Sequence, residues 1–166
     1  MAVSIAPPTG GPTPAPLRLW RRMSGSQVGR LAFSAGVWAK APYFATALPI
    51  VQVAEPGRAV VAAPKWFGVH NHLGTFHAIA ACNLAEAAMG IVMEVSVPST
   101  HRWIPKAMTV NYLKKATTGL TATARPAAVD IATLTEGAEV PVDIEIVDTN
   151  GVVVVAATIT TWVTPR

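Results

Sequence analysis

Four polar residues interrupt the alanine-rich stretch from 71 to 90, NHLGTFHAIAACNLAEAAMG, and their types suit acid–base chemistry. They are Asn71, His77, Asn83 and Glu86. The stretch predicts a helix that begins near Thr75, with Gly74 as a flexible start and the Thr75 hydroxyl as a cap. Because small apolar residues occur on all of its sides, we expect this helix to be buried on every side, where polar groups need partners.

The spacing of His77 and Glu86 predicts whether both side chains can reach one site within a single chain. Nine residues of helix correspond to about 180° of rotation and roughly 13 Å of rise. One continuous helix therefore cannot bring both side chains to the same small site. Two copies of the helix that run antiparallel about a two-fold axis place His77 of one copy near Glu86 of the other. We expect two equivalent composite sites at one interface between subunits.

The composition indicates one compact domain that associates with itself. The chain has 166 residues, of which 51% are hydrophobic and 13% charged, so we expect a large core and apolar surface buried between subunits. The net charge of +4 comes from scattered Lys and Arg residues. No basic run interleaved with aromatic residues occurs, and nucleic acid is not an expected partner. The single cysteine, Cys82, allows no intrachain disulfide and favours a reducing compartment, where it serves as a small apolar residue.

The N-terminus predicts a tail and no targeting signal. Residues 1–16 are rich in Pro, Gly, Thr and Ala, and we expect a disordered tail before a single domain at 17–166. The tail lacks the basic start and apolar stretch of a signal peptide. No uninterrupted apolar run of about 18 residues occurs, so a cytoplasmic protein without membrane insertion is expected.

The order of predicted elements favours an α+β fold. An amphipathic helix is expected at 24–40, after a turn of helix at 17–22. Strands are expected at 50–54, 59–63, 102–115, 120–129, 140–148 and 152–164. A turn at 55–58 and the Asn150-Gly151 pair predict hairpins, and Pro105 predicts an edge strand or a bulge. Together these elements predict one antiparallel sheet that wraps around the central helix.

Three motifs in the sequence resemble those of a known protein family. Asn71-x-x-Gly74-Thr75-x-His77, followed by an acidic residue nine positions after the histidine, is similar to the signature of hotdog-fold acyl-CoA thioesterases of the phenylacetyl-CoA and medium-chain type. The later VNYLKKA at 110–116 resembles the strand that follows their helix, and GRLAF at 29–33 resembles a subfamily often left as a domain of unknown function. The resemblance covers about 18–165 and implies a hotdog fold.

The resemblance also implies a catalytic set. Glu86 matches the carboxylate that acts as general base on water or as nucleophile, and Asn71 matches the residue that orients the carbonyl or the water. His77 matches the histidine that polarises or orients the thioester. The backbone N–H of Ala78 matches the oxyanion-hole donor. Hydrolysis of a thioester builds negative charge on one oxygen, and amides at a helix N-terminus are aimed donors for it.

Further residues are expected to bind the substrate, and each has a structural alternative. Gly74, Thr75 and Asn83 line the expected site, and Arg102 and Lys114 are candidates for the phosphates of coenzyme A. Asn83 also suits a bond to Glu86 or to the opposing helix, Asn71 also suits a loop cap, and the basic residues also suit solvated strand ends. His70 and His72 lack the acidic partners of a metal site, and no metal or other cofactor is expected.

The predicted function is therefore hydrolysis of an acyl-CoA or related thioester by a homodimer or a dimer of dimers. The acyl chain is expected in a slot lined by the small residues of the helix. Two alternatives stay open. Family members often carry His-Gly-Gly where this chain has His77-Ala78-Ile79. Because of this difference, a non-catalytic protein that binds acyl-CoA or lipid is the first alternative. A hotdog hydratase or dehydratase also uses a histidine and a helix carboxylate.

Overall fold

The computed structural model describes residues 13–166. Three α-helices, three short 3-10 helices and six strands follow one another along these residues. The helices are α1 (Ala15–Met23), α2 (Gln27–Lys40) and α3 (Ala78–Ser96), with 3-10 turns η1 (Pro42–Ala47), η2 (Phe67–Val69) and η3 (Ile131–Thr133). The strands are β1 (Ile50–Glu55), β2 (Arg58–Ala63), β3 (His101–Tyr112), β4 (Leu120–Pro126), β5 (Ala138–Asp148) and β6 (Val153–Pro165).

All six strands form one antiparallel sheet in the order β1-β2-β4-β5-β6-β3. Its alternating pattern puts apolar side chains on one face, as in β5, where Val140, Val142, Ile144 and Ile146 are buried and the residues between them are exposed. Strand β3 lies at one edge, and its register with β6 shifts between Pro105 and Ala107. The proline therefore marks both an edge strand and a bulge, as the sequence predicted.

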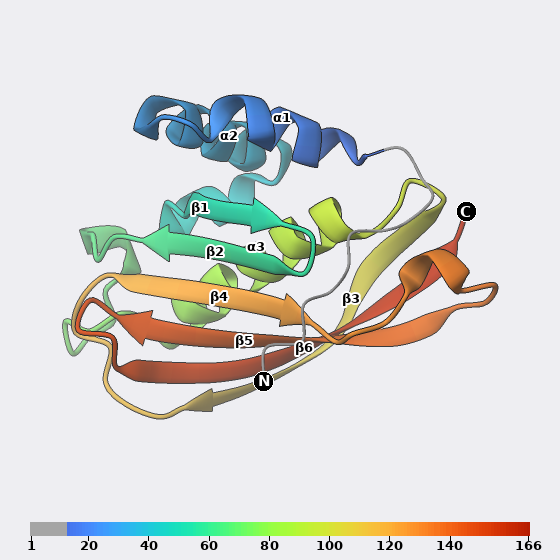
Figure 1. The fold of residues 1–166 in the computed structure, drawn as a ribbon. Coiled ribbons are helices and arrows are strands. Elements are labelled where there is room, and N and C mark those ends of the chain that lie inside the picture. The colour runs from blue at the N-terminus through green and yellow to red at the C-terminus, as the bar shows by residue number, and fades with distance from the viewer. Residues whose placement is uncertain (1–12) are drawn as a thin grey trace.

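Helix α3 lies against the apolar face of the sheet, which curves around it (Figure 1). Leu84, Met89, Val92 and Met93 are among its fully buried side chains. One 18-residue window of this helix is apolar enough to cross a membrane, but 61% of that window is buried inside the fold. A helix that fills the core of a soluble domain has these same properties, so the hydropathy of α3 is explained by the sheet around it.

Helices α1 and α2 cover the β1 edge of the sheet and one side of α3 (Figure 1). They pack against each other through an edge-to-face contact of Trp20 and Phe33, whose ring centroids are 5.1 Å apart. The buried hydroxyl of Ser34 donates to the carbonyl of Arg30 and accepts the N–H of Val51, which joins α2 to β1. The N-terminal helices are therefore bonded into the fold.

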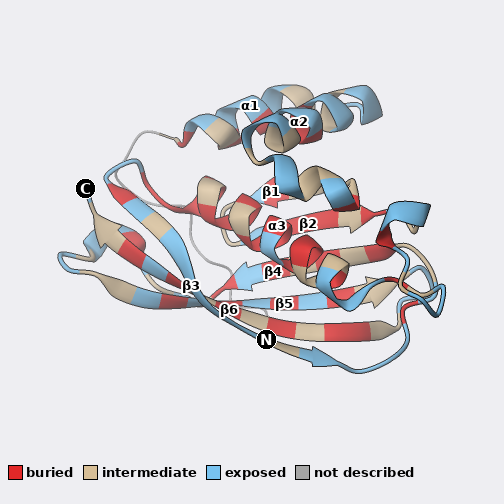
Figure 2. Ribbon diagram, turned by 180° about the vertical axis from the view of Figure 1, so that it is seen from behind, coloured by how far each residue is buried: buried red, intermediate tan, exposed pale blue. Residues whose placement is uncertain are grey.

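The structure confirms the predicted α+β arrangement and corrects three details. The tail expected at 1–16 lies outside the described residues up to position 12, and Ala15 and Pro16 belong to α1. Helix α3 begins at Ala78 and not near Thr75. It is also not buried on every side in the single chain, since Ile79 is 56% exposed and Glu86 is exposed (Figure 2). The sheet covers only one side of the helix.

Candidate active site

The loop before α3 is built on the side chain of Asn71. Its Oδ1 accepts the backbone N–H groups of Leu73 (2.9 Å) and Thr75 (3.0 Å), and its Nδ2 donates to the Thr75 hydroxyl (2.8 Å). The backbone N–H of Asn71 also donates to the Thr75 carbonyl at 2.9 Å. The Asn71 amide thus holds a tight turn, which is the loop-capping alternative raised by the sequence.

The conformation of this turn explains why positions 74 and 75 are glycine and threonine. Gly74 has φ +70°, in the left-handed region that a residue with a Cβ rarely adopts. Thr75 faces back to Asn71 and does not cap α3. Both residues therefore shape the loop, and neither makes the cap that the sequence predicted.

His77 is the N-cap of α3. Its ring Nδ1 accepts the backbone N–H of Ile79 at 3.1 Å, and its backbone N–H donates to the Val69 carbonyl at 2.7 Å. A neutral imidazole whose Nδ1 accepts a hydrogen bond carries its proton on Nε2. The side chain is exposed, so the structure holds the ring by one nitrogen and leaves the Nε2–H donor open to solvent.

Two backbone donors lie beside this ring. Within residues 13–166 no acceptor is found for the N–H groups of Ala78 and Ala80, whereas Ile79 and Ala81 donate to the Nδ1 and the carbonyl of His77. Unpaired amides in the first turn of a helix attract negative charge, and the helix dipole adds to the effect. With the imidazole Nε2–H, this end of α3 presents three donors that are suited to an oxyanion.

Glu86 lies away from these donors, as the spacing predicted. It is exposed on α3, nine residues after His77, which is about half a turn around the helix and roughly 13 Å along it. Within one chain the structure therefore joins Asn71, His77 and Ala78 at one end of α3 and leaves Glu86 apart from them.

Asn83 faces the N-terminal region and not the exposed side of α3. Its Nδ2 donates to the Thr46 hydroxyl (3.0 Å) and the Tyr43 carbonyl (3.3 Å), both in η1. The side chain is only 5% exposed, and its Oδ1 is buried without a hydrogen-bond partner among the described residues. Of the alternatives raised by the sequence for Asn83, a bond to Glu86 is not found in the structure.

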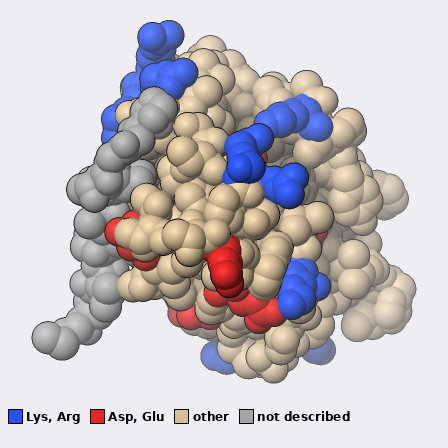
Figure 3. Space-filling view, turned by 90° about the vertical axis from the view of Figure 1, so that its right-hand side faces the viewer, with Lys and Arg blue, Asp and Glu red and all other residues tan. Residues whose placement is uncertain are grey.

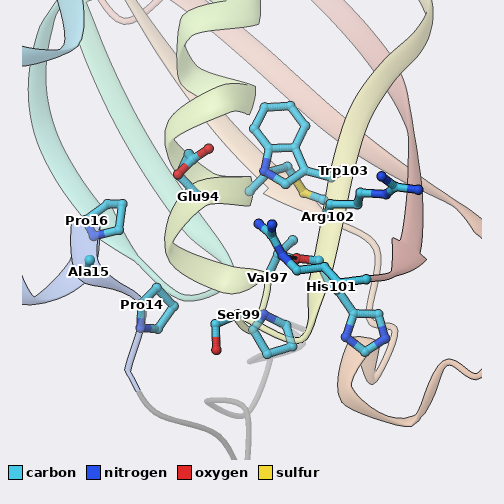
Figure 4. A pocket seen from close by; sticks show the side chains of 12 residues that line it. Pro14, Ala15, Pro16, Glu94, Val97, Ser99, His101, Arg102 and Trp103 are labelled. Atoms are coloured by element: carbon cyan, nitrogen blue, oxygen red, sulfur yellow. Dashed lines mark hydrogen bonds between the residues drawn. The ribbon is translucent and has the colours of Figure 1, made fainter. Parts of the chain in front are cut away.

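The two basic residues expected at the phosphates lie at opposite ends of β3. Arg102 is at the start of the strand and is one of the residues that line a pocket with Glu94, Trp103 and the first residues of α1, but its side chain extends away from Glu94 and α1 (Figure 4). Lys114 follows the other end, beside the β5–β6 turn, where its charge helps to lower the pKa of Asp148. The main cause of that lowered pKa is the hydrogen bond from the Val152 N–H. Of the two, Lys114 lies at the same end of the molecule as His77, since the Phe76 N–H donates to the Ala116 carbonyl.

One polar contact near the site was not predicted from the sequence. The Sγ of Cys82 lies 3.1 Å from the Tyr112 hydroxyl, which joins α3 to the end of β3. This hydrogen bond, with a smaller effect of burial, raises the pKa of Tyr112 to about 12. The two residues are 30 positions apart, and only the pairing of helix and strand in space brings them together.

The described residues hold no group of three or more His, Cys, Asp and Glu side chains that could bind a metal ion. On the face shown in Figure 3, acidic side chains gather in the lower part, whereas the basic side chains lie mostly in the upper part in separate groups and form no continuous basic surface.

Comparison with known proteins agrees with this architecture. A family model described as "Domain of unknown function (DUF4442)" matches residues 29–163. The chain belongs to the DUF4442 family. A crystal structure described as "genomics APC5556" is 38% identical to this DUF4442 protein, with a TM-score of 0.75, and the match covers 91% of this chain and 99% of that one. The comparison with curated proteins found no match.

More distant structures carry functional descriptions. PA5026 from Pseudomonas aeruginosa, described as a "Probable Thioesterase", is 24% identical over 93% of this chain and 99% of its own, with a TM-score of 0.74. The thioesterase HI1161 from Haemophilus influenzae is 13% identical over 81% of this chain and 90% of its own, with a TM-score of 0.69. This DUF4442 protein has the hotdog fold, and its structural neighbours include proteins described as thioesterases.

Proposed function

We propose that this DUF4442 protein hydrolyses an acyl-CoA or related thioester at a site shared between two copies of the chain. The observation that carries the proposal is the end of α3, where the N–H of Ala78 has no acceptor within residues 13–166 and the capping imidazole of His77 is exposed with its Nε2–H free. Such an arrangement suits the oxygen of a tetrahedral intermediate. The descriptions of the structural neighbours support the same reaction class.

In this mechanism the carboxylate comes from the partner. Glu86 of one copy takes a proton from water, and the water oxygen attacks the thioester carbonyl carbon next to His77 of the other copy. The carbonyl oxygen becomes an oxyanion that accepts the Ala78 N–H and the Nε2–H of His77. Collapse of the intermediate breaks the C–S bond, and the proton held by Glu86 passes to the thiolate. Asn71 contributes by holding the loop that positions His77.

Two exposed surfaces support a second copy as the partner. Strand β3 pairs on one side with β6, and within the described residues its other side has no strand partner. Twelve residues of mostly exposed edge strand are a template for pairing with another chain (Figure 2). On the side that faces α3, Met108 and Tyr112 of this strand remain 37% and 52% exposed. Apolar surface of this kind, next to the exposed Ile79 and Glu86, favours an interface.

A mixed dimer tests the composite site directly. Subunits with His77→Ala and subunits with Glu86→Gln, carrying different tags, are co-expressed and the mixed dimer is purified through both tags. Each variant alone is expected to have a kcat lowered about a hundredfold or more. The mixed dimer contains one site with both changes and one intact site, so about half of the wild-type rate is expected. A site built within one chain predicts no recovery at all.

Thiol release from a panel of acyl-CoA substrates separates the alternatives. Turnover that is lost in Glu86→Gln with the dimer intact supports the enzyme, and Glu145→Gln, on the outer face of β5, serves as the matched control. Binding of acyl-CoA without turnover across the panel supports a non-catalytic binder. The side chain of Ile79, 56% exposed beside the donors, is the feature that favours this second candidate. Addition of water to an enoyl thioester supports a hydratase.

A further inference from the structure

A cleft of about 560 Å³ lies between the N-terminal helices and the pair formed by α3 and β3. Its walls come from α1, α2, the start of η1, α3 and β3. Apolar side chains dominate the lining, among them Leu19, Phe33, Val37, Phe44, Met89 and Trp103. The volume falls within the range of pockets that bind small molecules, roughly 300–1,000 Å³.

The cleft starts at the proposed catalytic carboxylate. Glu86 is the first residue of α3 in its lining and Glu94 is the last. These eight positions correspond to about 12 Å along the helix. The residues of α3 that line the cleft between them are Ala87, Met89, Gly90 and Ile91, so this stretch of the helix contributes no charge. At its far end the cleft adjoins the pocket of Figure 4, with which it shares Ala15, Pro16, Glu94 and Trp103.

We propose that this cleft holds the acyl chain of the thioester and makes the protein selective for an uncharged chain of up to about ten carbons. The inference rests on the proposed function, since the chain must extend away from a carbonyl beside Glu86. At roughly 1.2 Å per bond, as in extended backbone, the 12 Å between the two glutamates accommodates about ten bonds. The N-terminal helices form the wall opposite α3, so bulk added to them is expected to shorten the chain that fits.

Two glycines keep the cleft open and offer a way to close it. Gly36 of α2 and Gly90 of α3 both line it. A Cβ at Gly36 would meet no atom within 4 Å, and a Cβ at Gly90 would meet only the Trp103 ring, at 3.8 Å. Neither glycine has a positive φ, so a larger residue fits the backbone at both positions. Gly36→Leu would place its side chain in the cleft without disturbing the helix.

The test compares Gly36→Leu with Ala35→Leu, which places the same side chain at an exposed neighbouring position of α2 outside the lining. Thiol release is measured with butyryl-CoA and decanoyl-CoA. In Gly36→Leu the ratio of kcat/KM for decanoyl-CoA to that for butyryl-CoA is expected to fall at least about tenfold. In Ala35→Leu this ratio is expected to match the wild type. An unchanged ratio in Gly36→Leu, with both proteins folded by circular dichroism, overturns the assignment.

A binding measurement separates this inference from the proposed function. If the wild type hydrolyses no acyl-CoA, the proposed function fails, and the cleft is then judged by calorimetric titration with decanoyl-CoA and with decanoate. Saturable binding that Gly36→Leu abolishes and Ala35→Leu retains supports the cleft as an acyl site. The absence of binding to the wild type overturns it. Turnover with an unchanged chain-length ratio retains the proposed function and rejects the cleft.

Discussion

The ring Nδ1 of His77 accepts the backbone N–H of Ile79 at 3.1 Å, so one side chain both caps α3 and fixes the tautomer of the imidazole. These two roles can be separated. The cap needs only an acceptor, whereas the proposed chemistry needs the donor on Nε2.

His77→Asn keeps a side-chain acceptor at the N-cap and removes the imidazole. We expect its free energy of unfolding to stay within about 0.5 kcal/mol of the wild type, whereas His77→Ala loses about 1 kcal/mol with the cap. Loss of a transition-state donor lowers kcat about a hundredfold in both variants. Urea unfolding and thiol release measure the two effects. An active His77→Asn would show that the ring only caps the helix.

Asn71→Ala removes three hydrogen bonds from the turn that leads to α3. Because two backbone N–H groups lose their acceptor, we expect a loss of about 1–3 kcal/mol in unfolding free energy. Faster amide hydrogen exchange of Leu73 and Thr75 should accompany it. If Asn71 acted on the substrate alone, Asn71→Ala would lose activity while the exchange rates stayed unchanged.

Asn83 has two hydrogen bonds to η1 and a buried Oδ1 that lacks a partner. Asn83→Ala loses the bonds and leaves a cavity, and we expect a cost of about 2 kcal/mol. Asn83→Leu loses the same bonds but fills the space and removes the unpaired oxygen, so a smaller cost of about 1 kcal/mol is expected. Chemical denaturation of both variants measures the difference, and equal costs would contradict this role of the Oδ1.

Because of its hydrogen bond to Cys82, the Tyr112 phenol is expected to lose its proton at a higher pH than an ordinary tyrosine. Its pKa is raised from 10.0 to about 12 in the folded protein. The folded state therefore binds one proton more than the unfolded state between these values, and the contribution of Tyr112 to stability is lost as the pH rises through them. Cys82→Ala should return the pKa towards 10.0. Ultraviolet absorbance titration of the phenolate measures it, with Tyr43→Phe used to assign the signal.

Much of the fold could be predicted from local patterns. The Asn150-Gly151 hairpin, the bulge at Pro105 and the central helix all follow from signals within a few residues. The start of α3 could not, because the choice between Thr75 and His77 as cap depends on Asn71, which occupies the Thr75 hydroxyl.

The candidate site was predictable only in part. Its residues at 71–78 are close in sequence, so their spacing indicates that they lie together at one end of α3. The direction of Asn83 depends on η1, which lies about forty positions earlier and packs against α3 only in the folded chain. The sequence likewise predicted an acyl slot along α3 from its small residues, but nothing in it indicated that α1 and α2 line the cleft that we propose for the chain.

Hydrogen bonds join α2 to β1 and to Pro49 just before it, and they restrict how far this wall of the cleft can move. The Ser34 hydroxyl meets the Val51 N–H at 2.9 Å, and the Trp38 indole donates to the Pro49 carbonyl at 2.9 Å. A helix held at two points along its length does not behave as a hinged lid. The cleft is thus preorganised, and a ligand that enters it spends little of its binding free energy on ordering the protein.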